Sequence, residues 1–221
     1  MVFVLTGAGS GIGAATARLA AEQGHDVVLH ARSADKLAAL AEETGGLAVP
    51  GDVTSWDDQQ AVMQRALDAY GRVDVVLANA GIGARRGFEE GDPERWREMV
   101  LTNVYGIALT IKASLPPLRA SRGHLVITSS LAGRRPLNGS LYSATKHATT
   151  AMGEAVRQEV NGTGVHVTLI EPGMVETEGF SHRLKETLRP IDIARAVLWA
   201  TAQPDHVDVN AIMVRPTAQE T

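Results

Sequence analysis

Apolar residues gather in short continuous runs along the chain instead of alternating with polar residues. The runs rich in β-branched residues are 2–6, 26–31, 47–53, 73–80, 124–130, 165–173 and 207–214. A strand that is buried on both faces has no polar face, so runs of this kind favour a parallel sheet covered on both sides. The pattern predicts about seven strands, most of them buried on both faces.

Stretches with helical periodicity lie between these runs. They cover 13–24, 33–45, 55–71, 93–115 and 191–204, and the segment 139–152 is also compatible with a helix. Ser33 and Ser55 stand at expected helix starts, and Gly24, Gly45 and Gly71 lie just past expected helix ends. Strands and helices that alternate with short connections predict a single doubly wound α/β domain of the Rossmann type, spanning 1–221.

Composition narrows the classes of function. The 221 residues suffice for one domain with a sizeable core, and 44% hydrophobic and 21% charged residues are ordinary for a globular protein. A net charge of −4 gives no basic field for nucleic acid. The chain has no cysteine, which suits a cytoplasmic protein, and its seven histidines show no metal-binding spacing. No run approaches the roughly 20 apolar residues that span a bilayer, and the start of the chain lacks a signal-peptide pattern.

A glycine-rich sequence, TGAGSGIGAAT, joins the first expected strand to the first expected helix. Glycines at such a turn let the backbone approach a pyrophosphate, and the helix N-terminus offers free N–H groups to its charge. One reading, GxGxxG/A, uses Gly9, Gly11 and Ala14, and the other, GxxxGxG, uses Gly7, Gly11 and Gly13. Its place between strand and helix predicts a dinucleotide site rather than a merely structural turn.

The end of the second expected strand bears on which dinucleotide is bound. A site for NAD usually places Asp or Glu there to hold the ribose 2′-hydroxyl, whereas this chain has Ala31 followed by Arg32. A guanidinium pairs with a 2′-phosphate, so we expect NADP(H) in preference to NAD(H). The alternative is that Arg32 is only a solvated charge in a loop and does not contact the cofactor. Asp26 lies at the wrong end of the strand to hold the ribose. His30 could lie near the 2′-phosphate, but a single histidine at the end of a strand more often has a structural role.

Tyr142 and Lys146 stand four residues apart in the segment GSLYSATKHATTAM. Positions i and i+4 share one face of a helix, so both side chains can face one cleft. A nearby ammonium favours the phenolate, and we therefore expect Lys146 to lower the pKa of Tyr142. Alone, such a pair is more often a chance feature of a surface helix.

The complete set of motifs resembles the short-chain dehydrogenase/reductase family, and the likeness runs over nearly the whole chain. The motifs are TGAGSGIG for TGxxxGxG, GDV at 51–53, ANAG at 78–81 for NNAG, Asn103 in LTNVYG, Ser130 in ITSS, YSATK for Tyr-x-x-x-Lys, and EPGMVET at 171–177 for PG-x-V-x-T. The ending HVDVNAIMVRPTAQ more weakly resembles a subgroup of NADP-dependent enzymes that oxidise 3-hydroxy acids and serine.

The resemblance implies an NADP(H)-dependent oxidoreductase that interconverts a carbonyl compound and a secondary alcohol, or a hydroxy acid. Tyr142 would be the general acid and base, Ser130 would orient the substrate oxygen, and Asn103 would hold a water of the proton relay. Lys146 would also hold the nicotinamide ribose. The implied cofactor-binding residues are Gly7, Gly9, Ser10, Gly11, Ile12, Gly13, Arg32, Asp52, Val53, Asn79, Ala80, Gly81, Tyr142, Lys146, Pro172, Gly173, Val175 and Thr177. Other members commonly form homodimers or homotetramers.

The chain departs from the family in two places. The spacing from Ser130 to Tyr142 is one residue shorter than usual, so Ser129 remains an alternative for the serine role. The segment that forms the substrate lid in the family, here 174–190, is also short, which predicts a weakly enclosed pocket.

Other readings remain open. Arg85, Arg86, Arg134 and Arg135 lie in loops at the expected pocket mouth, where they are either solvated charges or attract an acidic substrate. A non-catalytic NADP-binding sensor could use the same fold. A sugar-nucleotide epimerase or dehydratase shares Tyr-x-x-x-Lys, but this chain is short for the additional substrate domain.

Overall fold

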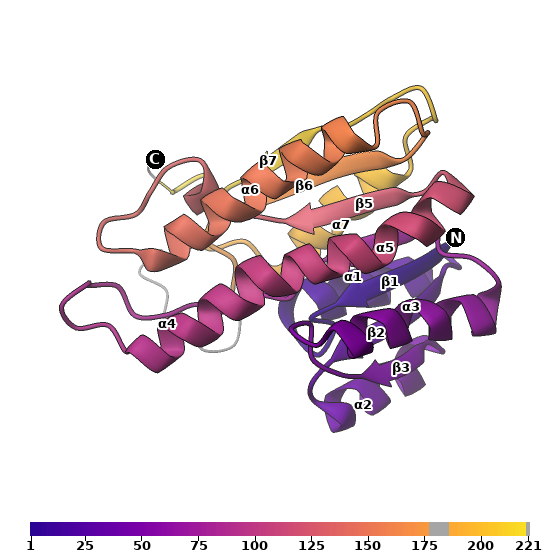
Figure 1. Cartoon of the computed structure of the whole chain (residues 1–221), viewed down its shortest axis with the longest axis horizontal. Coiled ribbons are helices and arrows are strands. Elements are labelled where there is room, and N and C mark those ends of the chain that lie inside the picture. Colours follow the sequence, from indigo (N-terminus) through magenta and orange to yellow (C-terminus); the bar gives the residue numbers. More distant parts are fainter. Residues whose placement is uncertain (177–185, 220–221) are drawn as a thin grey trace.

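A computed structural model describes residues 1–176 and 186–219 and confirms the doubly wound α/β fold in a single domain (Figure 1). The strands are β1 (Val2–Thr6), β2 (Asp26–Ala31), β3 (Leu47–Pro50), β4 (Val75–Ala78), β5 (His124–Thr128), β6 (His166–Pro172) and β7 (Ala211–Val214). They form one sheet in the order β3-β2-β1-β4-β5-β6-β7, and every neighbouring pair is parallel.

Helices follow the strands as the sequence predicts. The long ones are α1 (Gly11–Glu22), α2 (Ala34–Thr44), α3 (Trp56–Tyr70), α4 (Pro93–Val100), α5 (Ile107–Ser121), α6 (Leu141–Glu159) and α7 (Pro190–Thr201). A π-helical segment, η1 (Leu101–Gly106), joins α4 to α5, and a short 3-10 helix, η2 (Leu131–Gly133), follows β5.

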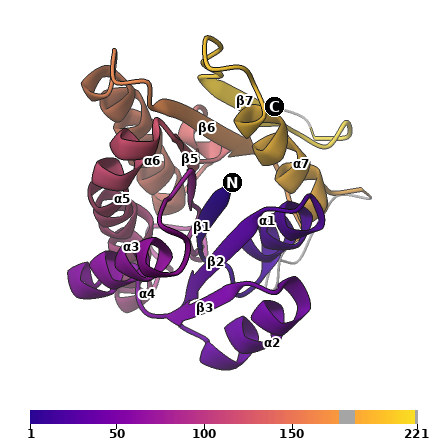
Figure 2. The ribbon, with the colours of Figure 1, turned by 90° about the vertical axis from the view of Figure 1, so that its right-hand side faces the viewer.

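The helices cover both faces of the sheet, and each face has its own core. Figure 2 shows α1, α2 and α7 on one side and α3, α4, α5 and α6 on the other. Leu5, Leu29 and Ile193 belong to the core on the first side, and Val4, Val62 and Leu118 belong to the core on the second. Residues that alternate along the five central strands therefore enter opposite cores, which explains why most of the strands have no polar face. The edge strands β3 and β7 differ, because their residues are only partly buried or are exposed.

The predicted helix over 93–115 differs from the observed one. The structure divides it into α4, the π-helical η1 and α5, and α5 continues to Ser121 with Pro116 and Pro117 inside it. The predicted ends of the other helices agree better. Ser55 caps α3 by accepting a hydrogen bond from the backbone N–H of Asp58, and Gly45 and Gly71 end α2 and α3 in the left-handed conformation.

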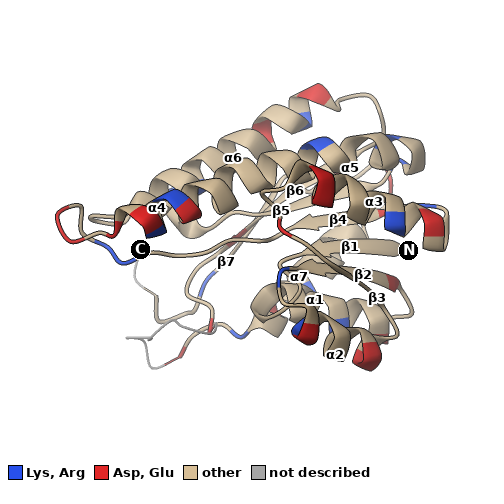
Figure 3. Ribbon diagram, turned by 60° about the horizontal axis from the view of Figure 1, so that its bottom comes forward, with Lys and Arg blue, Asp and Glu red and all other residues tan. Residues whose placement is uncertain are grey.

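Charged side chains lie mainly on the outer faces of the helices and in the loops, and the strands carry few of them (Figure 3). Over residues 1–176 and 186–219, no helix is both long enough and apolar enough to cross a membrane. Apolar side chains fill most of the interior, and the buried polar side chains on the strands are Thr6, His30, His124, Thr128, Thr168 and Glu171.

The strand order reverses direction at β1, which lies between β2 and β4. In open α/β sheets the crevice for a ligand forms at such a switch point, outside the carboxyl ends of the strands. A ligand site at this edge would therefore be formed by the residues that follow β1, β2, β4, β5 and β6.

Candidate active site

The turn between β1 and α1 favours the GxxxGxG reading over GxGxxG/A. Gly7 has a positive φ of 66°, and a Cβ atom there would lie 2.9 Å from the Cα of Ala80. A Cβ atom on Gly13 would lie 2.4 Å from the carbonyl oxygen of Gly7. On Gly9, by contrast, its nearest neighbour would be the Cβ of Ala31 at an ordinary 3.6 Å. The turn thus needs glycine at positions 7 and 13 and tolerates a side chain at Gly9.

Helix α1 begins directly on this turn. Ser10 is its N-cap, but the Ser10 hydroxyl accepts no hydrogen bond from the first turn. Gly11 starts the helix and Ile12 packs on the core beside it. The N–H groups of the first turn lack a side-chain cap, which is the arrangement that suits an incoming phosphate.

The end of β2 lies against the same turn. The N–H of Ala8 donates to the carbonyl oxygen of His30 at 3.2 Å. Arg32 is exposed and forms no hydrogen bond or ion pair with any other residue that the structure describes. The His30 ring is buried and is held by Val49 and Gln59, which agrees with a structural role. Burial lowers the pKa of His30.

The GDV motif follows β3. Oδ1 of Asp52 accepts hydrogen bonds from the backbone N–H and the hydroxyl of Thr54, which closes a tight turn. Val53 is buried under the π-helical segment, because a Cβ atom on Gly106 would lie only 2.8 Å from its Cγ2. Val53 therefore joins the predicted adenine side of the site to η1.

The segment after β4 is fastened to the end of β1 by Thr6. The Thr6 hydroxyl accepts hydrogen bonds from the backbone N–H groups of Asn79 at 3.0 Å and Ala80 at 3.3 Å. The Asn79 amide donates to the Thr6 carbonyl oxygen at 3.2 Å. Thr6 begins the glycine motif, but the motif does not reveal this role, because the contacts of Thr6 join segments more than 70 residues apart.

Gly81 brings Asn103 and Lys146 together. A Cβ atom on Gly81 would lie 3.3 Å from the Oδ1 of Asn103 and 3.6 Å from the Nζ of Lys146. These predicted site residues thus converge from β4, η1 and α6. Glycine at this position leaves the space between the two side chains open.

The Asn103 side chain holds the loop after β4. Its Oδ1 accepts from the N–H of Ile82 at 2.8 Å, and its Nδ2 donates to the carbonyl oxygen of Ile82 at 2.9 Å. Nδ2 also donates to the hydroxyl of Thr145 on α6 at 3.1 Å. The observed function of this amide is to fasten η1 to two neighbouring segments, and the water-holding role stays a prediction.

The two candidate serines after β5 point to different neighbours. The buried Ser129 hydroxyl lies 2.7 Å from the Thr150 hydroxyl and donates to the carbonyl oxygen of Lys146 at 3.2 Å, so it faces α6. The Ser130 hydroxyl is near enough to the Tyr142 phenol to lower its pKa. It also accepts from the N–H of Ala132 and lies 3.4 Å from the carbonyl oxygen of Pro172. This geometry favours Ser130 for the role beside Tyr142.

Tyr142 and Lys146 lie on α6, which begins after the N-cap Ser140. The Lys146 side chain is buried, and its ammonium donates to the carbonyl oxygen of Thr128 at 2.8 Å and lies 5.8 Å from the centre of the Tyr142 ring. Burial lowers the pKa of Lys146 to about 8.

The expected lowering of the Tyr142 pKa by Lys146 is wrong in direction. Burial raises the pKa of Tyr142 above its ordinary value, and the neighbouring Ser130 hydroxyl offsets only part of that rise. Spacing along a helix shows which side chains share a face, but it does not show how much water the surrounding segments exclude. The Tyr142 phenol is accordingly protonated at neutral pH.

The PG-x-V segment follows β6. The N–H of Gly173 donates to the carbonyl oxygen of Val214 at 2.7 Å, and Val175 forms an isolated parallel bridge with Leu188. The side-chain oxygen of Gln219 accepts from the N–H of Met174 at 2.9 Å, a contact that sequence analysis missed. Thr177 and most of the expected lid lie outside the described residues.

The structure thus gathers the predicted residues at the carboxyl edge of the sheet. The glycine turn, Asn79, Gly81 and Arg32 adjoin β1, β2 and β4, whereas Ser130, Tyr142 and Pro172 adjoin β5 and β6. No cluster of three His, Asp or Glu side chains among residues 1–176 and 186–219 is arranged to bind a metal ion.

Comparison with known proteins identifies what this arrangement is similar to. The family model described as short chain dehydrogenase matches residues 1–187. An uncharacterized oxidoreductase of Staphylococcus aureus strain MRSA252 is 39% identical over 223 residues, which cover 97% of this chain and 96% of the relative.

Solved structures superpose on nearly the whole chain. An alcohol dehydrogenase from the archaeon Thermococcus sibiricus, complexed with 5-hydroxy-NADP, is 32% identical with a TM-score of 0.90, covering 100% of this chain and 98% of that one. A serine dehydrogenase complexed with NADP+ is 29% identical with a TM-score of 0.92 and coverage of 100% and 97%. A 3-ketoacyl-(acyl-carrier-protein) reductase from Brucella melitensis, complexed with NADH, is 27% identical with a TM-score of 0.91 and coverage of 97% and 96%.

Proposed function

The chain belongs to the short-chain dehydrogenase family and is an oxidoreductase, and we propose that it interconverts a carbonyl compound and a secondary alcohol or hydroxy acid with NADP(H). The observation that carries the proposal is the convergence at one edge of the sheet. There Ser130, Tyr142 and the buried Lys146 lie on elements at the same edge of the sheet as the glycine turn. A phenol, an ammonium and a dinucleotide turn at one edge suit hydride transfer coupled to proton transfer.

The residues present fit a dinucleotide. The close approaches at Gly7 and Gly13 leave a turn with no side chains on its inner side, and the first N–H groups of α1 are available to phosphate oxygens. Gly81 leaves open space between Asn103 and Lys146. Gly7, Gly9, Ser10, Gly11, Ile12 and Gly13 would hold the pyrophosphate, Asp52 and Val53 the adenine, and Asn79, Ala80, Gly81, Lys146, Pro172, Gly173, Val175 and Thr177 the nicotinamide half.

The preference for NADP(H) depends on Arg32. Its guanidinium has no partner in the described part of the chain, and Ala31 brings no carboxylate to repel a 2′-phosphate. Two of the similar structures are complexed with NADP-type cofactors and one with NADH, so the neighbours alone leave the preference open. The charge at the end of β2 supports NADP(H).

The proton chemistry follows from the state of Tyr142. Burial raises the pKa of the Tyr142 phenol, so the protonated form would donate its proton to the carbonyl oxygen during reduction, and the phenolate would take a proton from the alcohol during oxidation. The Ser130 hydroxyl would donate a hydrogen bond to the same oxygen and stabilise its developing charge. The nicotinamide, when bound, supplies or accepts the hydride. Lys146 would hold the ribose and bring positive charge near the phenol.

The substrate would enter beside the loops that carry Arg86 and Arg135. Both side chains are exposed and, unlike Arg85 and Arg134, have no ion-pair partner among the described residues. A carboxylate on the substrate would find complementary charge there. The serine dehydrogenase neighbour is consistent with a substrate of this class.

We also propose a cytoplasmic homodimer or homotetramer. Val100, Leu101 and Tyr105 are exposed where α4, η1 and α5 follow one another, and an apolar strip of this kind suits contact with a second copy. We further propose that the segment 174–190 serves as a short lid over the substrate.

Consumption of NADPH over a panel of ketones, aldehydes and keto acids tests the proposed activity. We expect turnover with at least one class, and we expect hydroxy acids or secondary alcohols to drive NADP+ reduction in the reverse assay. Tight NADPH binding with no turnover in either direction would favour the non-catalytic sensor instead.

A further inference from the structure

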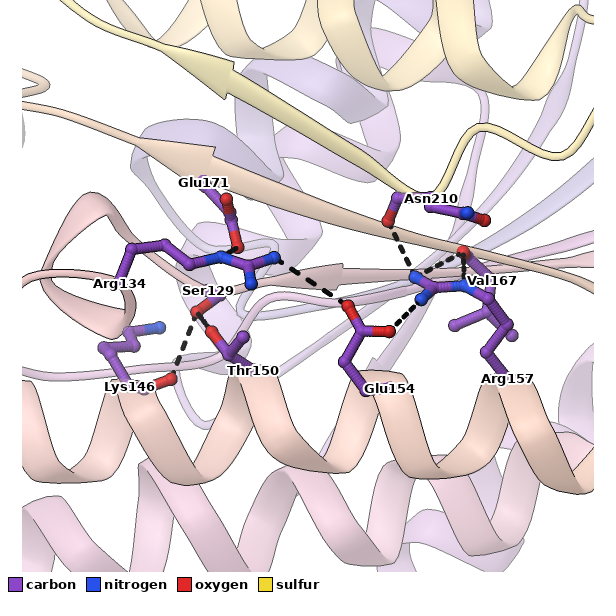
Figure 4. Close-up of polar contacts among 9 residues, drawn as sticks. All are labelled: Ser129, Arg134, Lys146, Thr150, Glu154, Arg157, Val167, Glu171 and Asn210. Atoms are coloured by element: carbon purple, nitrogen blue, oxygen red, sulfur yellow. Dashed lines mark hydrogen bonds and ion pairs between the residues drawn. The ribbon is translucent and has the colours of Figure 1, made fainter.

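An ion pair that the sequence does not reveal adjoins two residues of the candidate site. The Nε of Arg134 donates to the Oε1 of Glu171 at 2.6 Å (Figure 4). Arg134 follows η2, whose N-cap is Ser130, and Glu171 directly precedes Pro172 on β6. The pair therefore joins the segment that carries Ser130 to the strand that leads into the PG-x-V turn.

Glu171 depends on Arg134 for its charge. The Glu171 side chain is only 2% exposed, whereas that of Arg134 is 38% exposed. Within residues 1–176 and 186–219, no other side chain donates a hydrogen bond to the Glu171 carboxylate. A buried carboxylate without a partner is strongly unfavourable, so the contact restrains the backbone at Arg134 as well as neutralising Glu171.

The other side of the Arg134 guanidinium faces helix α6. Its Nη2 lies 3.8 Å from the Oε1 of Glu154, and Glu154 also pairs with Arg157. Arg157 in turn donates to the carbonyl oxygen of Val167 at 3.2 Å and to that of Asn210 at 2.7 Å. Figure 4 shows these side chains as a continuous row between α6 and the strands. Arg134 is thus held from the helix as well as from β6.

Helix η2 cannot move closer to α6 to compensate for a loss of this pair. A Cβ atom on Gly133 would lie 2.7 Å from the carbonyl oxygen of Lys146 and 2.7 Å from the hydroxyl of Ser129. One side of η2 is therefore already at closest approach. Three contacts fix η2 along β6: the backbone N–H of Ser129 donates to the carbonyl oxygen of Ile170 at 2.8 Å, the Ser130 hydroxyl lies 3.4 Å from the carbonyl oxygen of Pro172, and Arg134 pairs with Glu171. Of these, only the Arg134 contact lies at the far end of η2.

We propose that the Arg134–Glu171 ion pair positions the Ser130 hydroxyl, by fixing the distance between η2 and the Pro172–Gly173 turn. Arg134 and Glu171 are positioning residues that act through Ser130. This inference rests on the proposed function, because it gives Ser130 a substrate-orienting role. The shortened loop between Ser130 and Tyr142 leaves little chain to hold η2 in place, which makes a side-chain contact at Arg134 effective.

The test compares Arg134→Met, Glu171→Gln and the double variant Arg134→Met/Glu171→Leu with a control, Arg119→Met. The control breaks the exposed Arg119–Glu159 pair between α5 and α6. We expect kcat for the best panel substrate to fall about 10- to 100-fold in Arg134→Met, since misplacing one donor to the reacting oxygen has costs on that scale. The Kd for NADPH should change less than about threefold, and Arg134→Lys should recover part of the lost kcat.

The double variant separates positioning from stability. It removes both charges, so no buried carboxylate is left unpaired and the melting temperature should return toward that of the unmodified protein. We expect kcat to stay low, because the directional contact is still missing. A kcat in the double variant equal to that of the unmodified protein would overturn the proposal, as would a kcat in Arg134→Met no lower than in the Arg119→Met control.

A second readout does not need turnover. Amide hydrogen exchange across 131–135 should quicken at least about tenfold in Arg134→Met, or in Glu171→Gln if the former does not fold, and should stay unchanged in Arg119→Met. Unchanged exchange there would overturn the proposal even if no substrate were found. Absence of turnover in the unmodified protein, together with quickened exchange, would count against the proposed activity and not against the ion pair.

Discussion

The ammonium of Lys146 donates a hydrogen bond to the carbonyl oxygen of Thr128 at 2.8 Å and has no carboxylate partner among the described residues. Burial lowers the pKa of Lys146 from 10.5 to about 8. The buried positive charge of Lys146 therefore lowers the stability of the fold, and it lies where the candidate chemistry needs a cation.

Replacing Lys146 by Met should stabilise the fold while it removes function. The lowered pKa corresponds to roughly 3 kcal/mol against the charged form, and loss of the bond to Thr128 returns about 1 kcal/mol. We expect the unfolding free energy at pH 7 to rise by about 2 kcal/mol in Lys146→Met, measured by urea denaturation.

The gain in unfolding free energy in Lys146→Met should become smaller as the pH rises. The penalty is fully present below about pH 8 and is relieved as the pH rises from about 8 toward 10.5, because the unfolded chain then binds more protons than the folded one. The difference between Lys146→Met and the unmodified protein should shrink over that window. A difference that grows with pH would contradict the burial of a charged Lys146.

The glycine turn gives a matched pair of substitutions. Gly13→Ala places a methyl group 2.4 Å from the carbonyl oxygen of Gly7, whereas Gly9→Ala meets only the Cβ of Ala31 at 3.6 Å. We expect Gly13→Ala to lose about 1–3 kcal/mol of stability and to bind NADPH at least tenfold more weakly. Gly9→Ala should change both little, as followed by thermal unfolding and fluorescence titration. If Gly9→Ala lowered stability and NADPH affinity as much as Gly13→Ala, Gly9 would be required as well, as the GxGxxG/A reading supposes.

Substitutions of the two serines after β5 should have different effects, one on kcat and the other on stability. Ser130→Ala removes the hydroxyl beside Tyr142, so we expect kcat to fall about 100-fold with stability little changed. Ser129→Ala leaves the buried Thr150 hydroxyl with one partner fewer, so we expect a loss of about 1–2 kcal/mol with smaller effects on kcat. Steady-state kinetics and denaturation on both variants check this, and the opposite assignment would show the reverse pattern.

The strands could be predicted from the sequence because burial on both faces leaves a direct trace in the residue pattern. Runs such as 2–6 and 26–31 became β1 and β2 with the same bounds. The motif residues also predicted which side chains meet at the edge of the sheet, because the carboxyl ends of parallel strands lie together.

The π-helical segment could not be predicted in this way. It is stabilised by Asn103, whose amide bonds to Ile82 and to Thr145, residues that are 21 and 42 positions away. Local periodicity contains no such information. The Arg134–Glu171 pair, 37 positions apart, and the raised pKa of Tyr142 were missed for the same reason, since both depend on which segments pack together.

Arg32 should decide the choice of cofactor. A guanidinium that pairs with a 2′-phosphate contributes about 1.5–3 kcal/mol, so Arg32→Ala should weaken NADPH binding about 10- to 100-fold and leave NADH binding nearly unchanged. Thermal shifts with each cofactor at matched concentrations measure this, because a ligand stabilises the fold according to its concentration over Kd. Equal shifts with NADPH and NADH in the unmodified protein would contradict the role of Arg32.

Tyr142→Phe tests the central claim most directly. The substitution removes one oxygen atom, and the Phe ring retains the packing of the site, so the Kd for NADPH should stay within about threefold. We expect kcat for the best carbonyl substrate, followed by NADPH consumption at pH 7, to fall about 100- to 10,000-fold with loss of the general acid. A Tyr142→Phe variant that binds NADPH and turns over at the unmodified rate would contradict the assignment of Tyr142 as the proton donor.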